Sequence, residues 1–242
     1  MRGWLVLAVL AGCGFEVGGT SSDAPRAIDA APVVDASPDA PGPPITLVQK
    51  GTDHPGSGSM LEVTMPAPQI AGNTNIVVVS WFAAAGEVQS VSDTSGNTYA
   101  STNIPIAGSF SIRMFYAANI IGSANGNHIV AQLASSVSYP KLRVFEYAGL
   151  GPSPFEGGTS SNGNGSSVSS GPVTTTTPHV LLFAADVIDG SSGAIAPFVA
   201  RDITDGDLVE THEVQVAGTY TATATIGFPN RWVMMMAAFR GT

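Results

Sequence analysis

Short runs in which apolar and polar residues alternate recur along most of the chain, and Gly, Asn, Ser and Pro stand between them. Phe110, Ile112 and Met114, for example, alternate with Ser111 and Arg113. A period of two over many short segments is typical of antiparallel sandwiches and barrels. We therefore predict an all-β domain over residues 45–242, an antiparallel jelly-roll-like β-sandwich. The predicted strands are Ile45–Lys50, Met60–Met65, Asn75–Phe82, Phe110–Ala117, His128–Leu133, Lys141–Ala148, His179–Asp186, Leu208–Ala217, Thr219–Thr225 and Trp232–Phe239.

Three segments depart from simple alternation. Asn75–Phe82 is apolar at consecutive positions, which predicts a central strand that is buried on both faces. Met234–Met236 is predicted to fill part of the core, because Met adapts to irregular spaces. Gly157–Pro178 consists mainly of Gly, Ser and Thr, and there we expect a flexible loop with an attached edge strand.

The first 44 residues carry a different pattern. The apolar run Leu5–Ala11 follows Arg2 and is much shorter than the roughly 20 residues of a membrane-spanning helix. Residues 1–12 are therefore predicted to be a signal peptide. From residue 14 to residue 44, Asp, Ala and Pro alternate, so the segment is short of both amide donors and apolar surface. We expect residues 13–44 to form a disordered acidic linker, which reaches on the order of 90 Å at about 3.1 Å per residue.

The charge balance disfavours two classes of function, and the cysteine content limits how the domain can be stabilised. The formal net charge is −9, with 18 acidic and 9 basic residues. This balance disfavours nucleic-acid binding and electrostatic docking on anionic lipid, which both need a basic surface. Cys13 is the single cysteine, so no internal disulfide can form and the domain depends on packing and backbone hydrogen bonds.

The segment Leu10-Ala11-Gly12-Cys13 resembles the lipobox of bacterial lipoproteins. The resemblance implies that the Cys13 sulfur takes up a diacylglyceryl group carrying fatty acids such as palmitate, and that the peptide before it is then cut. Gly14 rather than Asp follows the cysteine, which in Gram-negative lipoproteins implies the outer membrane. The linker after Cys13 is similar to the stalks of many bacterial surface lipoproteins. An ordinary secretory signal, with Cys13 incidental, is the alternative.

Three further segments resemble a widespread, poorly characterised extracellular bacterial β-sandwich domain. They are the strand–turn–strand stretch at residues 88–99, the stretch from Tyr139 to Leu150, and the closing strand from Trp232 to Arg240. The resemblance covers residues 45–242 and implies a fold, with no activity attached to it.

Acidic residues supply the candidate metal ligands. Asp202, Asp205, Asp207 and Glu210 surround a Gly and form a candidate calcium site, because hard oxygen ligands suit this ion. A solvated acidic loop is the alternative. The stretch around Asp93 also offers oxygen ligands, but its Asp, Ser, Gly and Asn are the residues that a hairpin turn requires, and we favour the turn.

Glu146 lies in phase with Leu142 and Val144 on a face that should be apolar. A buried carboxylate needs a partner, so we expect a structural Arg beside it, with a catalytic acid as the second interpretation. The candidate partners are Arg113, Arg143 and Arg231.

We expect a non-enzymatic, lipid-anchored protein of the cell envelope that displays a binding or adhesion module, with glycan as the first ligand class. A glycan binder should expose aromatic residues around a shallow groove, and the candidates are Trp81, Trp232, Tyr99 and Phe155. The alternatives are a structural or assembly component of the envelope and a cryptic hydrolase.

The lipobox interpretation predicts that Cys13 carries the lipid. Labelled palmitate should enter the wild-type protein and should not enter Cys13→Ser, because the hydroxyl does not replace the thiol as acceptor. Gel autoradiography of both proteins from a bacterial host measures this, and equal labelling of the two would contradict the prediction.

Overall fold

The computed structural model describes residues 42–242, which form fourteen β-strands and contain no helix. The predictions for the signal peptide, for Cys13 and for linker residues up to 41 lie outside the described residues. The strands are β1 (Thr46–Asp53), β2 (Ser57–Thr64), β3 (Thr74–Trp81), β4 (Val88–Asp93), β5 (Ala100–Ser101), β6 (Ser111–Ala117), β7 (His128–Ser138), β8 (Lys141–Ala148), β9 (Leu150–Thr174), β10 (Val180–Ile188), β11 (Ser192–Ala194), β12 (Val199–Thr204), β13 (Asp207–Val214) and β14 (Thr219–Gly241).

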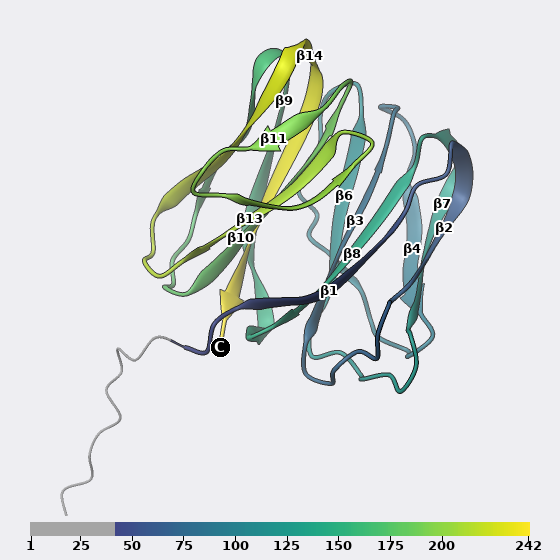
Figure 1. Ribbon diagram of the computed structural model, residues 1–242, viewed down its shortest axis with the longest axis vertical. Helices are drawn as coiled ribbons and strands as arrows, with labels where there is room; N and C mark the ends of the chain where they lie inside the picture. Colours follow the sequence, from purple (N-terminus) through teal and green to yellow (C-terminus); the bar gives the residue numbers. More distant parts are fainter. Residues whose placement is uncertain (1–41) are drawn as a thin grey trace, which may run out of the picture. The chain divides into compact units, whose positions relative to one another are not determined.

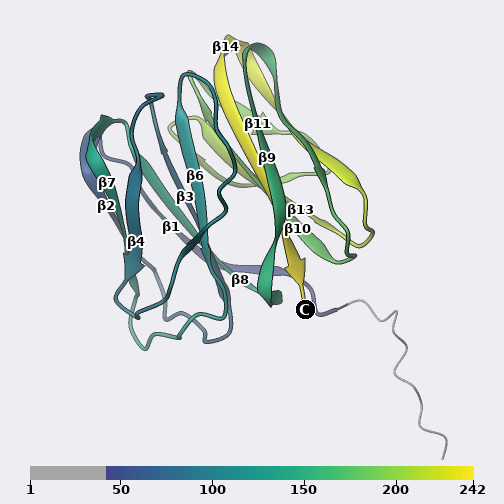
Figure 2. The same cartoon turned by 180° about the vertical axis from the view of Figure 1, so that it is seen from behind.

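The strands form three antiparallel sheets that stack in layers (Figure 1). The central sheet has the order β1-β8-β3-β6-β5. On one side lies the three-stranded sheet β2-β7-β4, and on the other the six-stranded sheet β11-β14-β10-β13-β12, in which β9 also pairs with β14 (Figure 2). The prediction of an all-β antiparallel sandwich is confirmed, and the structure adds a third sheet. The jelly-roll topology stays a prediction.

The central sheet is buried on both faces, as the sequence of β3 predicts. Ile76 and Val78 of β3 belong to the core that faces the six-stranded sheet. Val77 and Val79 belong to the core that faces the three-stranded sheet. All eight residues of β3 are buried, because the strand lies between β8 and β6 within the middle layer.

Strands β6 and β7 show the predicted alternation of side chains. Phe110, Ile112 and Met114 lie together in the core between the central and six-stranded sheets. In β7, Ile129 and Leu133 lie in the core on the other side of the central sheet. Each strand therefore buries alternate side chains, as a pleated sheet with one apolar face requires.

The expected loop in the tract 157–178 is wrong for most of its length. Its residues up to Thr174 belong to β9, which pairs with β14 from Leu150 to Thr174 apart from several irregularities. The ladder needs only backbone groups, and β14 supplies the apolar side chains. Gly163 illustrates why small residues suit this strand: a Cβ built on it would lie 2.6 Å from the Trp232 ring. The composition therefore reflects close packing.

The two C-terminal predicted strands are parts of one strand, β14, whose pairing with β9 shifts between Thr225 and Asn230. Its Met run is core, as predicted. Met235 points toward the central sheet, whereas Met234 and Met236 lie in a second apolar cluster on the other face of the six-stranded sheet.

The described chain enters and leaves at the same end of the sheets. Gly42 lies against Thr242, and the Thr242 N–H donates to the Gly149 carbonyl at 3.0 Å. Strand β10 begins at this end, where Val180 pairs with Arg240, and ends at Ile188. At about 3.3 Å per residue, the end of β10 lies roughly 26 Å away.

The core between the central and six-stranded sheets is predicted to hold the layers together. Phe183 is fully buried, with its ring centroid 5.3 Å from that of Phe145. Phe183→Ala should lower the free energy of unfolding by about 3–5 kcal/mol, because it leaves a cavity. The matched control is Phe228→Ala, which removes a side chain that is 79% exposed and should change stability by less than about 0.5 kcal/mol. Urea unfolding measures both, and equal effects would contradict the layer arrangement.

Candidate functional site

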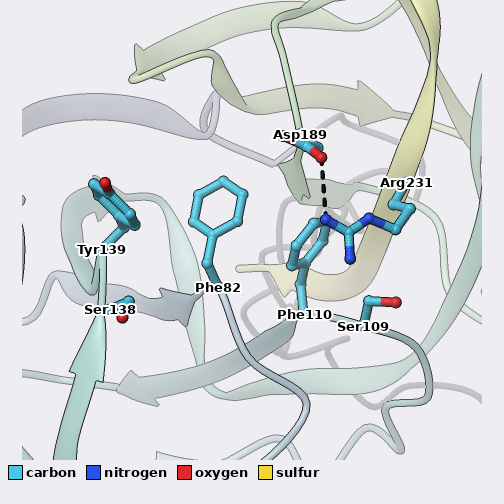
Figure 3. Close-up of a pocket in the computed structure, with 7 residues that line it drawn as sticks. All are labelled: Phe82, Ser109, Phe110, Ser138, Tyr139, Asp189 and Arg231. Atoms are coloured by element: carbon cyan, nitrogen blue, oxygen red, sulfur yellow. Dashed lines mark hydrogen bonds and ion pairs between the residues drawn. The ribbon is translucent and has the colours of Figure 1, made fainter.

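A cavity of about 400 Å³ opens at the end of the sheets where β3 and β10 finish and β6 and β8 begin (Figure 3). It lies opposite the end where the described chain enters. Ligand pockets of this size are common in proteins. Its lining residues come from five places in the sequence: Phe82 after β3, Ser109 and Phe110 before β6, Ser138 at the end of β7 with Tyr139 after it, Asp189 after β10, and Arg231 in β14. We refer to it as the end pocket.

Aromatic rings form one side of the end pocket. The Phe82 and Phe110 rings meet edge to face, with centroids 4.8 Å apart. Tyr139 stands nearly perpendicular to Phe82, at a centroid distance of 5.8 Å and an angle of 81°. Phe110 is rooted in the core, whereas Tyr139 is 58% exposed. The result is a corner of two perpendicular aromatic rings that is open to solvent.

Tyr139 is held in place by its backbone. Its φ of 48° lies in the left-handed region, and Pro140 follows it. Its N–H donates to the Gly56 carbonyl at 2.9 Å. A non-glycine residue at positive φ is uncommon and needs support from its surroundings. The tyrosine ring is therefore presented by a fixed turn.

A charged pair forms the opposite side of the end pocket. Arg231 Nη2 donates to Asp189 Oδ2 at 3.1 Å, and the Asp189 N–H donates to the Arg231 carbonyl at 3.1 Å. The Arg231 guanidinium also lies over the Phe110 ring, 5.1 Å from its centroid. Figure 3 shows this pair beside Phe110, with Phe82 between it and Tyr139. The pocket is thus aromatic on one side and polar on the other.

A second cation reaches Phe82 from inside the protein. Lys141 Nζ lies 4.9 Å from the Phe82 ring centroid and donates to Asp207 Oδ2 at 2.8 Å. Lys141 and Asp207 are both buried, at 1% and 0% exposure. Arg143 donates to the Asp207 carbonyl at 3.2 Å. The floor of the end pocket therefore rests on a buried charge cluster between two sheets.

Two further buried carboxyl groups lie on the opposite face of the six-stranded sheet from Asp207. Besides Asp207, the fully buried carboxyl groups of Asp186 and Glu210 lie in the six-stranded sheet. By strand alternation, Glu210 shares the face of β13 that carries Leu208, and Asp186 shares the face of β10 that carries Ala184. Neither Glu210 oxygen, nor Asp186 Oδ2, has a hydrogen-bond partner within residues 42–242. Unpartnered buried carboxylates are costly in their charged form.

Burial raises the pKa values of all three carboxyl groups. For Glu210 the pKa rises to about 8, first because the group is desolvated and then because Asp186 is near. The pKa of Asp186 rises to about 7 through desolvation and the charge of Asp207. Desolvation also raises the pKa of Asp207, although Arg143 and Lys141 act to lower it.

The expectation of an Arg partner for Glu146 is wrong. Glu146 is fully buried, and amide groups surround its carboxylate. The donors to its two oxygens, at 2.6–3.3 Å, are Gln49 Nε2, Gln69 Nε2, the Ile70 N–H and Asn73 Nδ2. Gln49 faces Glu146 directly across the β1–β8 ladder. Four donors replace the single cation that the sequence analysis expected, and they leave Glu146 no access to a substrate.

The Asp93 stretch is a turn, as predicted. Gly96 has a φ of +80°. The Asp93 carboxylate accepts hydrogen bonds from the Asn97 N–H, Asn97 Nδ2, the Tyr99 hydroxyl and Asn127 Nδ2, at 2.7–2.9 Å. Burial acts to raise the pKa of Asp93, but these hydrogen bonds outweigh it and hold the pKa below its usual range. Donors occupy the lone pairs that a calcium ion would need.

The four acids of the predicted calcium site are not brought together. Asp205 and Gly206 both have positive φ and form the two-residue turn between β12 and β13. Asp202 pairs with Lys50 at 2.7 Å, and Asp207 with Lys141. Strand alternation then sends Asp207 and Glu210 to opposite faces of the sheet. Within residues 42–242, no group of three His, Cys, Asp or Glu side chains is placed to hold a metal ion.

The four aromatic residues predicted to line a glycan groove do not form one. They pack in the protein or take part in its internal hydrogen bonds. Trp81 is fully buried and donates from Nε1 to the Ala85 carbonyl at 2.8 Å. Trp232 is 8% exposed, and Tyr99 belongs to the Asp93 network. Phe155 packs against Phe239, with centroids 5.9 Å apart. The exposed aromatic corner comes from residues at strand ends, and the Tyr139-Pro140 turn was the available signal.

Comparison of the chain with known protein families, with curated proteins and with solved structures finds no significant match. In the part of the chain that the structure describes, no helix is long and apolar enough to cross a membrane.

The raised pKa of Glu210 makes stability depend on pH. Between the ordinary pKa of 4.5 and the folded pKa of about 8, unfolding releases a proton that the folded protein keeps. The free energy of unfolding should therefore fall as pH rises through this window. Glu210→Gln carries no such proton. Between pH 5 and pH 8 its free energy of unfolding should therefore fall less than that of wild type, by on the order of 3 kcal/mol.

Urea unfolding at both pH values measures this slope, and comparison within one variant cancels any pH-independent cost of the amide. The control is the exposed Glu87→Gln, which should keep the wild-type slope. An unchanged slope in Glu210→Gln would contradict the prediction.

Proposed function

We propose that the protein is a lipid-anchored protein of the cell surface that binds glycan through the end pocket. The end pocket carries this proposal. It combines a solvent-open aromatic corner, made by Tyr139 and Phe82, with a polar wall made by Asp189 and Arg231. A sugar ring has the same two sides, because its C–H face is apolar and its edge carries hydroxyl groups. Stacking on an aromatic ring and hydrogen bonding to a charged pair complement these sides.

The anchor and the location rest on the sequence. The lipobox ending in Cys13 supports lipid attachment, Gly14 supports the outer membrane, and the Asp/Ala/Pro-rich residues that follow support a stalk. A stalk that carries a β-sandwich domain suits a binding or adhesion role. In the described residues, the end pocket contains one carboxylate, Asp189, whereas hydrolysis of a glycosidic bond uses two that face one cleft.

An assembly role in the envelope is the second candidate, and one observation favours it. Strand β12 lies at the edge of the six-stranded sheet and exposes Val199 and Ile203 by 52% and 53%. Open edges can pair with other chains. This edge is partly blocked, because its pairing with β13 shifts at Arg201, and Lys50 Nζ donates to the Arg201 carbonyl at 2.6 Å. We therefore rank assembly below glycan binding.

The glycan proposal is tested with the full chain on a glycan array, followed by calorimetry on the best ligand. Tyr139→Ala should weaken binding at least about tenfold, because loss of a stacking ring costs on the order of 1.4 kcal/mol. Phe228→Ala removes another exposed aromatic ring, outside the end pocket, and should leave the affinity unchanged.

The proposal fails if no glycan binds, or if both variants lose affinity equally. Concentration-dependent association of the wild type, with no glycan binding, would favour the assembly role instead.

A further inference from the structure

We propose that the end pocket selects an electrically neutral saccharide unit, and excludes sugars that carry an amine, a carboxylate or a sulfate. This inference rests on the proposed glycan binding and names the ligand class of the same pocket. It follows from the charges around the pocket, each of which already has a partner inside the protein.

Cationic sugars are disfavoured because the Phe82 and Phe110 rings already face cations. Lys141 lies over Phe82 at 4.9 Å, and Arg231 lies over Phe110 at 5.1 Å. An aromatic ring attracts a cation through the negative potential of its face, and here two fixed cations use that potential. An amino sugar in the pocket would therefore gain little from either ring.

Anionic sugars are disfavoured because the pocket's cations are neutralised. Arg231 is paired with Asp189 at 3.1 Å, and Lys141 with Asp207 at 2.8 Å. A carboxylate or sulfate would have to displace Asp189 from Arg231, or lie beside it as a like charge. The whole chain, at a net charge of −9, also repels anions at long range.

The same pairs leave hydrogen-bonding capacity that suits hydroxyl groups. Asp189 Oδ1 makes no side-chain hydrogen bond within residues 42–242, and Arg231 uses one of its five N–H groups on Asp189. The hydroxyls of Ser109 and Ser138 also line the pocket and add both donors and acceptors to it. A balanced pair next to two hydroxyls offers donors and acceptors together without net charge, which is what neighbouring sugar hydroxyls need.

The test compares matched sugars on the full chain by calorimetry. The probes are neutral hexose oligosaccharides, and the same oligosaccharides with uronic acid, sulfated or 2-amino units. Wild type should bind the neutral form at least about tenfold more tightly than each charged form. Its affinity should change less than about twofold between about 20 mM and 500 mM NaCl, because salt screens only charge–charge attraction.

Two variants that unbalance the pair sharpen the test. Asp189→Asn leaves Arg231 without its carboxylate and should move the preference toward uronic or sulfated forms. Arg231→Gln leaves Asp189 unpaired and should move it toward amino sugars. The shift in preference does not depend on total affinity, so it remains measurable if either variant binds more weakly.

Tighter, salt-sensitive binding of acidic or amino sugars by wild type would overturn this inference while the proposed function stands. Absence of saccharide binding overturns both. Unchanged preference in both variants would also overturn the inference, because the pair would then play no part in selection.

Discussion

The central sheet is covered on both faces, and this double burial sets the conditions for the rest of the molecule. Polar groups on β3 and β8 can find partners only inside the protein, because neither face meets water. Four of their side-chain atoms have none within residues 42–242: Thr74 Oγ1, Ser80 Oγ, Arg143 Nε and Tyr147 Oη. Glu146 meets this demand with four amide donors. Lys141 and Arg143, on the other face of β8, meet it with Asp207. The central sheet thus has one polar network on the face toward the three-stranded sheet and another on the face toward the six-stranded sheet.

The two networks differ in how completely they are satisfied. The carboxylate groups of the buried Glu146 and the half-buried Asp93 are each surrounded by donors, so neither charge is left unpaired. Asp207 is paired with Lys141 and Arg143, whereas Glu210, on the opposite face of the six-stranded sheet, is left without a partner in the described part of the chain. A protein that keeps such a group gives up stability near neutral pH. The Lys141–Phe82 contact links Asp207 and its two cations to the end pocket.

The sequence predicts the fold where side-chain pattern decides structure. Strand β3 and the alternation in β6 and β7 were predicted because burial on one or two faces leaves a direct trace in the residue order. Strand β9 was predicted only in part, as an edge strand attached to a loop, because its pairing with β14 uses backbone groups, which no residue type announces. The pairing of β9 with β14 joins segments that are far apart in the sequence, so it becomes visible only in the folded structure.

The candidate site was less predictable, because it joins residues that are far apart in sequence. Phe82, Tyr139 and Arg231 meet through the register of three sheets, and a single sequence carries no record of register. The same limit explains the acidic stretch: four carboxylates in nine residues suggested convergence, but a hairpin turn at Asp205-Gly206 sends them apart. Neighbouring residues on a strand point to opposite faces of the sheet, so closeness in sequence does not bring their side chains together.

Because residue 42 lies beside Thr242, the two ends of the sheets differ: one receives both ends of the described chain and the other carries the end pocket. Whatever precedes residue 42 leaves from one pole, and the end pocket opens at the other, about eight residues of strand away. The end pocket is therefore remote from the point at which the described chain enters, so a ligand in the pocket and the residues around position 42 do not compete for the same end of the sheets.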